Sequence, residues 1–332
     1  MKRRILTVIM SIALCVLFLT GCGEDSKTAV NEQSKTQVRV GSLKGPTSIG
    51  LVYLMDQSEN GETANDYSFT MAAAADELLP KMVSGDMDIV LVPSNVASVL
   101  YNKTEGGVSV IDINTLGVLY MVSGDESIQS MEDLKGRTVY LTGKGTTPDY
   151  VLQYLLSENG ITADDVALEY KSEATEVAAV LAENSDEVGV LPQPFVTAAC
   201  MQNEELSIVI DMTAEWAAVQ GEGGSSLVTG VTVVRKDFLN ENPAAVAEFL
   251  KEHKASAEYA NDNVEEAAEL VAKYGIIEKA PIAVKAMPYC NITYIDGVAM
   301  KQALAGYLEV LYGQDAASVG GSLPDDDFYY IP

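Results

Sequence analysis

Four short segments of the sequence place glycine, proline, hydroxyl, amide or lysine residues directly after a run of apolar residues. They are residues 44–48 (KGPTS), 93–95 (PSN), 142–147 (TGKGTT) and 192–195 (PQPF). A turn that runs into a helix presents free backbone N–H groups and the positive end of the helix dipole, which together favour an anionic group. The G-x-x-x-x-G-K-[ST] spacing of a nucleotide phosphate loop is absent, so these segments indicate solute binding rather than nucleotide hydrolysis.

The predicted ligand-binding residues are polar groups of these segments, with two aromatic residues as apolar walls. They are Lys44, Thr47, Ser48, Ser94, Asn95, Thr142, Lys144, Gly145, Thr146, Thr147, Gln193, Phe195 and Trp216. Each has a purely structural alternative. Ser94 and Asn95 are ordinary helix caps, and segment 142–147 can be a capped helix start with a solvated Lys144. Phe195 and Trp216 can equally be core residues.

Histidine and cysteine are too scarce for most catalytic or metal chemistry. The chain has one histidine and four cysteines, so a zinc site, a Cys/His pair or a Ser/His/Asp triad would have to use His253. His253 lies in an Ala- and Glu-rich helix over 244–259, between charged neighbours, and is interpreted as part of a solvated face. Cys200 and Cys290 are expected to be free thiols, with one disulfide as the alternative. We therefore predict no catalytic residue, no metal and no cofactor.

The charge balance is strongly acidic. The chain has 21 Lys and Arg residues against 48 Asp and Glu residues, a formal net charge of −27. Such a surface repels the phosphate backbone, so no nucleic-acid partner is expected. With 332 residues, of which 48% are hydrophobic, the chain exceeds one ordinary core and predicts about two folded units.

The N-terminal residues have the order of a bacterial lipoprotein leader. Three basic residues precede an apolar run over 5–19 that is shorter than a membrane span, and the sequence LTGC ending at Cys22 resembles the lipobox. This pattern predicts a signal peptide over 1–21, a lipidated Cys22 and a flexible tether over 22–37. It implies an extracytoplasmic protein that is anchored to the bacterial cell membrane. The alternative is an ordinary signal peptide with an incidental cysteine.

Strands and helices alternate along the chain, which predicts an α/β fold with parallel sheets. The predicted strands are residues 38–43, 67–71, 88–92, 138–141, 188–191 and 227–234. Lys44-Gly45 recurs as Lys144-Gly145, and Pro93 recurs as Pro192 at nearly the same offset. This repetition predicts two lobes of similar topology, each a mostly parallel sheet flanked by helices.

Lobe I is predicted to contain residues 38–124 and 227–332, and lobe II residues 125–226, so that the chain crosses twice between them. Open α/β sheets bind ligands at the carboxyl ends of their parallel strands. The four loop segments are therefore expected to face one another across a cleft.

Two further phrases carry a family resemblance. MEDLKGRTV over 131–139 stands at the entry to lobe II, and GVTVVRKD over 230–237 stands on the return. Together with the lipobox, the tether and the double crossing, they resemble the solute-binding proteins of ABC importers, most closely the SsuA/THI5-like (NMT1-like) group. The resemblance covers nearly all of the chain after the leader.

The resemblance implies a type II periplasmic-binding-protein fold that closes on a small solute and presents it to permease and ATPase subunits. The implied solutes are alkyl sulfonates, taurine, nitrate-like anions and thiamine-precursor pyrimidines. A monomeric, non-enzymatic protein is expected. One alternative is an extracellular sensor that binds the same solute. The other is a THI5-type pyrimidine-synthesis enzyme, whose PLP and Cys-rich site with a reactive histidine this sequence does not match.

Overall fold

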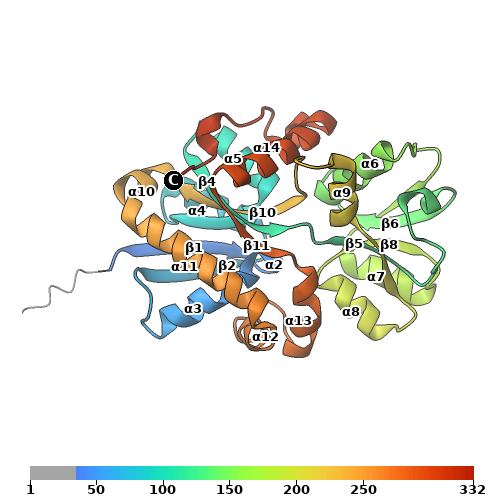
Figure 1. The fold of residues 1–332 in the computed structure, drawn as a ribbon, viewed down its shortest axis with the longest axis horizontal. Helices are drawn as coiled ribbons and strands as arrows, with labels where there is room; N and C mark the ends of the chain where they lie inside the picture. The colour runs from blue at the N-terminus through green and yellow to red at the C-terminus, as the bar shows by residue number, and fades with distance from the viewer. Residues whose placement is uncertain (1–34) are drawn as a thin grey trace, which may run out of the picture. The chain divides into compact units, whose positions relative to one another are not determined.

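The structure, a computed structural model, describes residues 35–332 and contains two β-sheets with helices on their faces (Figure 1). The first sheet has the strand order β11-β4-β10-β3-β1-β2. Its strands are β1 (Gln37–Leu43), β2 (Asp66–Ala72), β3 (Ile89–Pro93), β4 (Val108–Leu116), β10 (Val228–Arg235) and β11 (Ile292–Ile295). β1 pairs in parallel with β2 and β3, whereas β10 is antiparallel to both β3 and β4.

The second sheet has the order β7-β6-β8-β5-β9. Its strands are β5 (Leu119–Ser123), β6 (Thr138–Thr142), β7 (Ala167–Lys171), β8 (Val188–Pro192) and β9 (Ser207–Asp211). β6 is parallel to β7 and β8, and β5 runs antiparallel to its neighbours β8 and β9. Both sheets are therefore mixed rather than mostly parallel as predicted, because the strands next to the crossings, β4, β10 and β5, pair antiparallel with their neighbours.

The helices divide in the same way. The first half, defined as the first sheet with its helices, contains α2 (Pro46–Ile49), α3 (Val52–Glu59), α4 (Leu79–Ser84), α5 (Ser94–Lys103), α10 (Lys236–Glu241), α11 (Pro243–Asp262), α12 (Val264–Lys273), α13 (Ala280–Ala286) and α14 (Gly297–Gln314). The second half contains α6 (Thr147–Glu158), α7 (Ala174–Glu183), α8 (Phe195–Gln202) and α9 (Met212–Gln220). Short 3-10 turns follow α13, at Met287–Tyr289, and α14, at Ala316–Val319.

The predicted α/β fold and its strands are confirmed. β3 and β8 are buried along nearly their whole length, which explains why they are continuous apolar runs rather than alternating ones. One boundary differs from the expectation. The strand at 119–123, placed by the sequence in lobe I, pairs in the second sheet, because the chain crosses at Gly117 rather than after residue 124.

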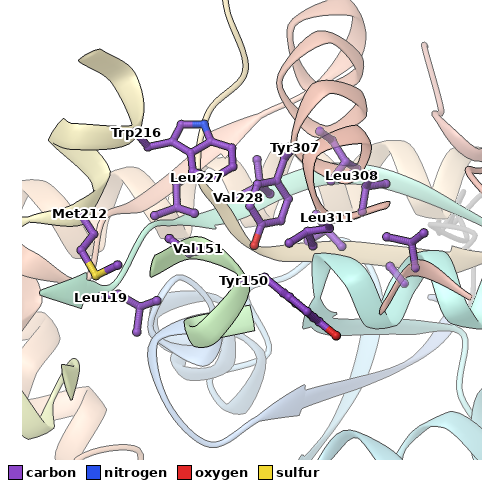
Figure 2. Packing of buried hydrophobic residues seen from close by; sticks show 14 of the residues in the cluster. Leu119, Tyr150, Val151, Met212, Trp216, Leu227, Val228, Tyr307, Leu308 and Leu311 are labelled. Carbon is purple, nitrogen blue, oxygen red and sulfur yellow. The ribbon is translucent and has the colours of Figure 1, made fainter. Parts of the chain in front are cut away.

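The apolar core is continuous between the two sheets. A single buried cluster contains Val90 of the first sheet, Val190 of the second, and residues of α6, α9 and α14. Figure 2 shows Tyr307 of α14 beside Trp216 of α9 and Val228 at the start of β10. α14 therefore packs against both halves.

A buried ion pair joins β1, β3 and β10 at the edge of the first sheet where β3 begins. The carboxylate of Asp88, at the start of β3, accepts hydrogen bonds from Arg39 Nε (2.8 Å) and Nη2 (2.6 Å) and from Arg235 Nη2 (3.2 Å). Burial alone would raise the pKa of this carboxyl group, but the hydrogen bonds from Arg39 and Arg235 outweigh it and hold the pKa below its usual value.

We expect Asp88 to contribute to acid resistance. Its folded-state pKa is depressed, so its contribution is complete above the pKa of an unfolded aspartate, about 4, and is lost as the pH falls through the folded value. Asp88→Asn should flatten the fall in free energy of unfolding below pH 4, measured by urea titrations at several pH values. Asp86→Asn, at an exposed neighbour, is the matched control and should leave the slope unchanged. Equal slopes for wild type and Asp88→Asn would contradict the assignment.

No helix within residues 35–332 is long and apolar enough to cross a membrane. The predicted signal peptide, Cys22 and most of the tether lie outside the described residues.

Candidate functional site

A cavity of about 660 Å³ lies between α8 and β9 of the second half and α13 of the first. In Figure 1, α13 and α8 face each other at the lower edge of the two sheets. The cavity is lined by Val196, Thr197, Cys200, Met201, Glu204, Leu206, Ser207, Ile208, Val284, Lys285, Pro288 and Tyr289. Its volume and its mixture of apolar walls with a few polar groups fit a small organic molecule. A second cavity of about 760 Å³, along α6 and β7, is lined from the second half alone.

The side chain of Gln193 does not itself line this cavity, but it has a fixed orientation because it is hydrogen-bonded to Thr197, which does. Gln193 links β8 to α8 and is only 2% exposed. Its Oε1 accepts hydrogen bonds from the hydroxyl of Thr197 (2.9 Å) and, at 3.4 Å, from the backbone N–H of the same residue. A backbone N–H can only donate, so the oxygen must face Thr197 and the amide cannot be flipped.

The other end of the Gln193 amide is unpaired. Nε2 is buried and has no hydrogen-bond partner among residues 35–332. A buried donor without an acceptor costs about 1–3 kcal/mol, and such a group calls for an explanation. An acceptor atom of a bound solute would provide the missing hydrogen-bond partner and so explain the unpaired amide.

The cavity is tied to the point where the chain passes from the first sheet to the second. The backbone N–H of Gln193 donates to the carbonyl of Val118, which lies in the crossing. The hydroxyl of Tyr120 in β5 donates to the carbonyl of Tyr289 in the cavity wall (2.8 Å), and the two rings meet edge to face at 6.0 Å. Burial raises the pKa of Tyr120, so this hydroxyl stays protonated as a donor at neutral pH.

The predicted segment 44–48 is bonded largely within itself. Ser48 donates to the carbonyl of Leu43 (2.6 Å), with the hydroxyl of Ser42 at 2.7 Å, and Thr47 also donates to Leu43 (3.2 Å). These hydroxyls close the turn between β1 and α2, while Lys44 is exposed. Their contacts in this structure are local.

The predicted anion loop, 142–147, already holds an acidic group of the protein. The backbone N–H of Gly145 donates to the buried carboxylate of Asp149 (2.8 Å), which also accepts from Gln153 (2.6 Å) and Tyr170 (2.7 Å). Lys144 is exposed and lies over the ring of Tyr170, 5.2 Å from its centroid. Asp149 thus supplies the negative charge that the start of α6 favours.

The remaining residues of that loop also make internal contacts. The hydroxyl of Thr146 donates to the carbonyl of Gly143 (2.5 Å), and Thr142 and Thr147 are half-buried at the end of β6 and the start of α6.

Ser94 and Asn95 meet backbone carbonyls rather than the cavity. Ser94 donates to Val228 (2.7 Å), and Asn95 donates to Ser318 (3.3 Å) in the turn after α14. α6, which follows the loop 142–147, reaches the same C-terminal segment, because Tyr150 donates to Asp315 (2.8 Å). The structure therefore brings Asn95 and the first turns of α6 to the end of α14, whereas Gln193 and Phe195 precede the cavity residues Val196 and Thr197.

The two aromatic candidates have different environments. Phe195 is 39% exposed at the start of α8, next to the cavity wall residue Val196. Trp216 is fully buried, its indole N–H donates to the carbonyl of Ser225 (3.1 Å), and its ring packs between Tyr154 and Tyr307. In this structure Trp216 is a core residue rather than an open pocket wall, because all of its surface is covered by protein.

The interpretation of His253 as a solvated residue is wrong. His253 is fully buried on α11, and its Nδ1 lies 3.2 Å from Oδ2 of Asp112, which is also fully buried. The charged neighbours in the sequence point away, whereas position 253 continues the buried stripe of the helix with Phe249 and Ala257.

Cys200 and Cys290 are both free thiols. Burial raises the pKa of Cys290 to about 12, and it also raises that of Cys200, which lines the cavity. Neither thiol is activated as a nucleophile.

None of the twelve residues that line the cavity is in the predicted ligand-binding set, and three of them show why. Thr197, Lys285 and Tyr289 come together from separate elements of the chain. Thr197 could have been found, because it follows Gln193 by one helical turn and therefore shares its face. Lys285 and Tyr289 carry no such signal, because only the packing of α13 against α8 brings them to the site. No cluster of His, Cys, Asp or Glu within the described range could hold a metal ion.

Comparison with known proteins gives a consistent result. Residues 107–267 match the family model described as NMT1/THI5 like. A protein of Brucella abortus (strain 2308), whose name gives binding as its provisional role, is 24% identical over 187 residues. That match spans 56% of this chain and 56% of the relative, so the chain spans little more than half the length of the curated relatives it matches.

Solved structures share the fold over most of the chain. An ABC transporter protein from Parabacteroides distasonis is 24% identical and superposes with a TM-score of 0.74, covering 90% of this chain and 99% of that one. The periplasmic aliphatic sulphonate binding protein SsuA from Escherichia coli is 16% identical, with a TM-score of 0.69 and coverages of 90% and 93%. The chain therefore has the periplasmic-binding-protein fold, and its residues 107–267 are NMT1/THI5-like in sequence.

Proposed function

We propose that this protein captures a small solute between its two halves and delivers it to the permease and ATPase subunits of an ABC importer. The observation that carries the proposal is the cavity of about 660 Å³ with walls from α8 and β9 on one side and α13 on the other. A solute in this cavity contacts both halves at once. It can then stabilise a closed arrangement by binding it more tightly than an open one.

The direction of opening follows from the packing. On the side of α14, the core is continuous from one sheet to the other, and Trp216, Tyr307 and Val228 are packed together (Figure 2). On the side of α8 and α13, the two halves meet around a cavity instead of through a continuous core. We propose that the cleft opens on this side, because the continuous core on the other side costs more to separate.

The solute is proposed to be a small organic molecule that carries an anionic or other acceptor group, of the sulfonate or taurine, nitrate-like or thiamine-precursor class. Gln193 supports an acceptor group, because its buried Nε2 has two N–H donors and no partner in the described chain. Lys285 in the cavity wall adds a positive charge. The contacts of Asp149 with the loop 142–147 favour placing the acceptor at Gln193 rather than at that loop.

A binding role is proposed in preference to catalysis. His253 is enclosed in the first half, and burial keeps both thiols protonated. A nucleophile must reach its substrate in its reactive, deprotonated form, whereas the thiol of Cys200, which lines the described cavity, stays protonated.

Thermal unfolding with and without a panel of sulfonates, nitrate, carboxylates and pyrimidine precursors tests the function. A specific solute at 100 times its Kd should stabilise the protein by about 2.7 kcal/mol. It should also slow alkylation of Cys200, followed by mass spectrometry of its peptide, because this thiol lines the cavity. Stabilisation without protection of Cys200 would place the solute elsewhere, and no stabilisation by any compound would contradict the proposed solute classes.

Gln193→Glu should weaken solute binding strongly. Glutamate keeps the oxygen that accepts from Thr197 but replaces the unpaired NH2 group by a second acceptor, which repels an acceptor on the solute. Loss of one such hydrogen bond predicts an increase in Kd of about tenfold to a hundredfold, measured by calorimetry. Gln202→Glu makes the same change at the exposed end of α8 and should leave Kd unaltered. An unchanged Kd in Gln193→Glu would remove Gln193 from the site.

The anchor is proposed to be a lipid on Cys22. The supporting observation is the order of basic residues, apolar run and LTGC in the sequence. Cys22→Ser should move the protein from the membrane fraction to the soluble fraction of the cells, as seen on immunoblots. Retention of this variant in the membrane fraction would exclude lipid anchoring at Cys22.

A further inference from the structure

The only histidine of the chain belongs to a buried polar chain that the proposed solute cavity does not use. His253 Nδ1 lies 3.2 Å from Asp112 Oδ2, and Asp112 Oδ1 accepts a hydrogen bond from the hydroxyl of Thr232 (2.8 Å). The Thr232 oxygen accepts in turn from Asn114 Nδ2 (3.1 Å). All four side chains are buried, with Asn114 only 2% exposed and the other three not exposed at all.

This polar chain connects α11 to both strands that lead to the crossings between the sheets. Asp112 and Asn114 are in β4, which ends directly before the crossing at Gly117. Thr232 is in β10, which begins where the chain returns to the first sheet, and it is paired with Asp112 across the ladder. His253 therefore contacts the carboxylate of Asp112 in β4, which also accepts a hydrogen bond from Thr232 in β10.

The opposite edge of the imidazole lies under α2. His253 Nε2 has no hydrogen-bond partner in residues 35–332, and it lies 3.7 Å from the position that a Cβ atom on Gly50 would take. Gly50 ends α2, and Thr47 of the same helix packs closely on Gly230 of β10. The turn after β1 and the strands β4 and β10 are thus all connected through the side chain of His253.

Within residues 35–332, Asp112 is the only acidic group in hydrogen-bond contact with the ring. On α11 the ring packs against Phe249 (5.4 Å between centroids), and on β11 it meets the edge of Tyr294 (6.0 Å). Lys254 lies on the ring of Tyr294, 5.9 Å from its centroid. A buried polar contact of this kind adds little net stability compared with well-packed apolar residues, but it can fix one arrangement of the groups that share it.

We propose that His253 is a positioning residue, which holds β4, β10 and α2 in the arrangement that sets the angle of the two crossings. The proposal rests on the proposed function only in treating movement at the crossings as opening and closing of a solute cleft. Its test uses the protein without solute, so it can fail while solute binding is confirmed, and the reverse is also true.

Hydrogen exchange of the full-length chain compares wild type with His253→Leu and His253→Asn. Leucine removes the donor to Asp112, whereas asparagine keeps an amide N–H near the position of Nδ1. We expect His253→Leu to accelerate exchange at residues 113–118 and 228–232 by tenfold or more, while residues 138–142 and 167–171 of the second sheet change less than twofold. His253→Asn should return the crossing segments to within about threefold of wild type.

Two results of this experiment would overturn the proposal. Equal acceleration in both sheets would mean that the histidine supports only global stability. Unchanged exchange at the crossing segments in His253→Leu would mean that it does not position them.

A measurement on the unaltered protein keeps the proposal testable if His253→Leu does not fold. Because the chain has one histidine, a single set of imidazole nitrogen signals is expected in ¹⁵N NMR spectra. The proposal requires a proton on Nδ1, the atom that faces Asp112. A neutral ring protonated only on Nε2 would contradict it, since Nδ1 could not then donate to the carboxylate.

Discussion

Trp216→Ala is expected to lower the free energy of unfolding by about 3–5 kcal/mol, the usual cost of removing a fully buried large aromatic side chain. Trp216 has no exposed surface, and its ring lies 4.8 Å from that of Tyr154 and 5.3 Å from that of Tyr307. The substitution leaves a cavity where α6, α9 and α14 meet, and it leaves the carbonyl of Ser225 without its indole donor. Urea unfolding followed by circular dichroism measures the change.

Phe195→Ala is the matched control for this prediction. Phe195 is the other aromatic residue that the sequence suggested for ligand binding, but it is 39% exposed, so its removal should change stability much less. Trp216→Phe should fall between the two. If Trp216→Ala were as stable as Phe195→Ala, the packing of α14 against the second half would not hold in solution.

Gly117→Ala is expected to destabilise the protein by about 1–3 kcal/mol, because it overfills the first crossing. A Cβ atom at this position would overlap the hydroxyl of Thr213 and would lie 2.6 Å from Cδ2 of Leu227. Thr213 is the second residue of α9, and Leu227, which is 2% exposed, stands just before β10. The clash must be relieved by displacing these packed side chains or by moving the backbone at one of the two crossings.

Gly313→Ala provides the control for Gly117→Ala. Gly313 lies in α14 with open space around its Cβ position, and alanine is the better helix former by about 0.8–1.0 kcal/mol. We therefore expect a small increase in stability there, measured by the same urea titrations. A loss of similar size in both variants would show that the close packing around Gly117 has no special effect.

The strands that the sequence predicts best are those whose burial gives a clear local pattern. β1, β3, β6 and β8 end within a residue or two of the expected positions, since each is a short apolar run that stops at a lysine, proline or threonine turn. The crossing was harder to place. Residues 108–122 form one apolar stretch, and nothing in its composition states that the part after Gly117 pairs with a different sheet.

The loop 142–147 illustrates a signal that was present in the sequence but was not used. Asp149 occupies the third position of α6, where an acidic side chain can accept a hydrogen bond from the backbone before the helix. An interpretation that considered Asp149 together with Lys144 would have expected the start of α6 to be satisfied internally.

His253 was misjudged for a similar reason. Its immediate neighbours Glu252 and Lys254 are polar, but residues three and four positions away are apolar, and in a helix it is these that share its face. The partner itself could not be predicted. Asp112 is 141 residues away, and only the packing of α11 on β4 brings it to the imidazole.

The single tryptophan lies where its intrinsic fluorescence can report movement between the two halves. Trp216 is the only indole in the chain, and it is enclosed between α9, α6 and α14, where the two halves share their core. Its emission therefore comes from one place, and neighbouring tyrosines can transfer excitation energy to it. Any movement of α14 relative to the second half alters the polarity and quenching around this ring. Domain motion can thus be followed in real time by intrinsic fluorescence, without an attached dye.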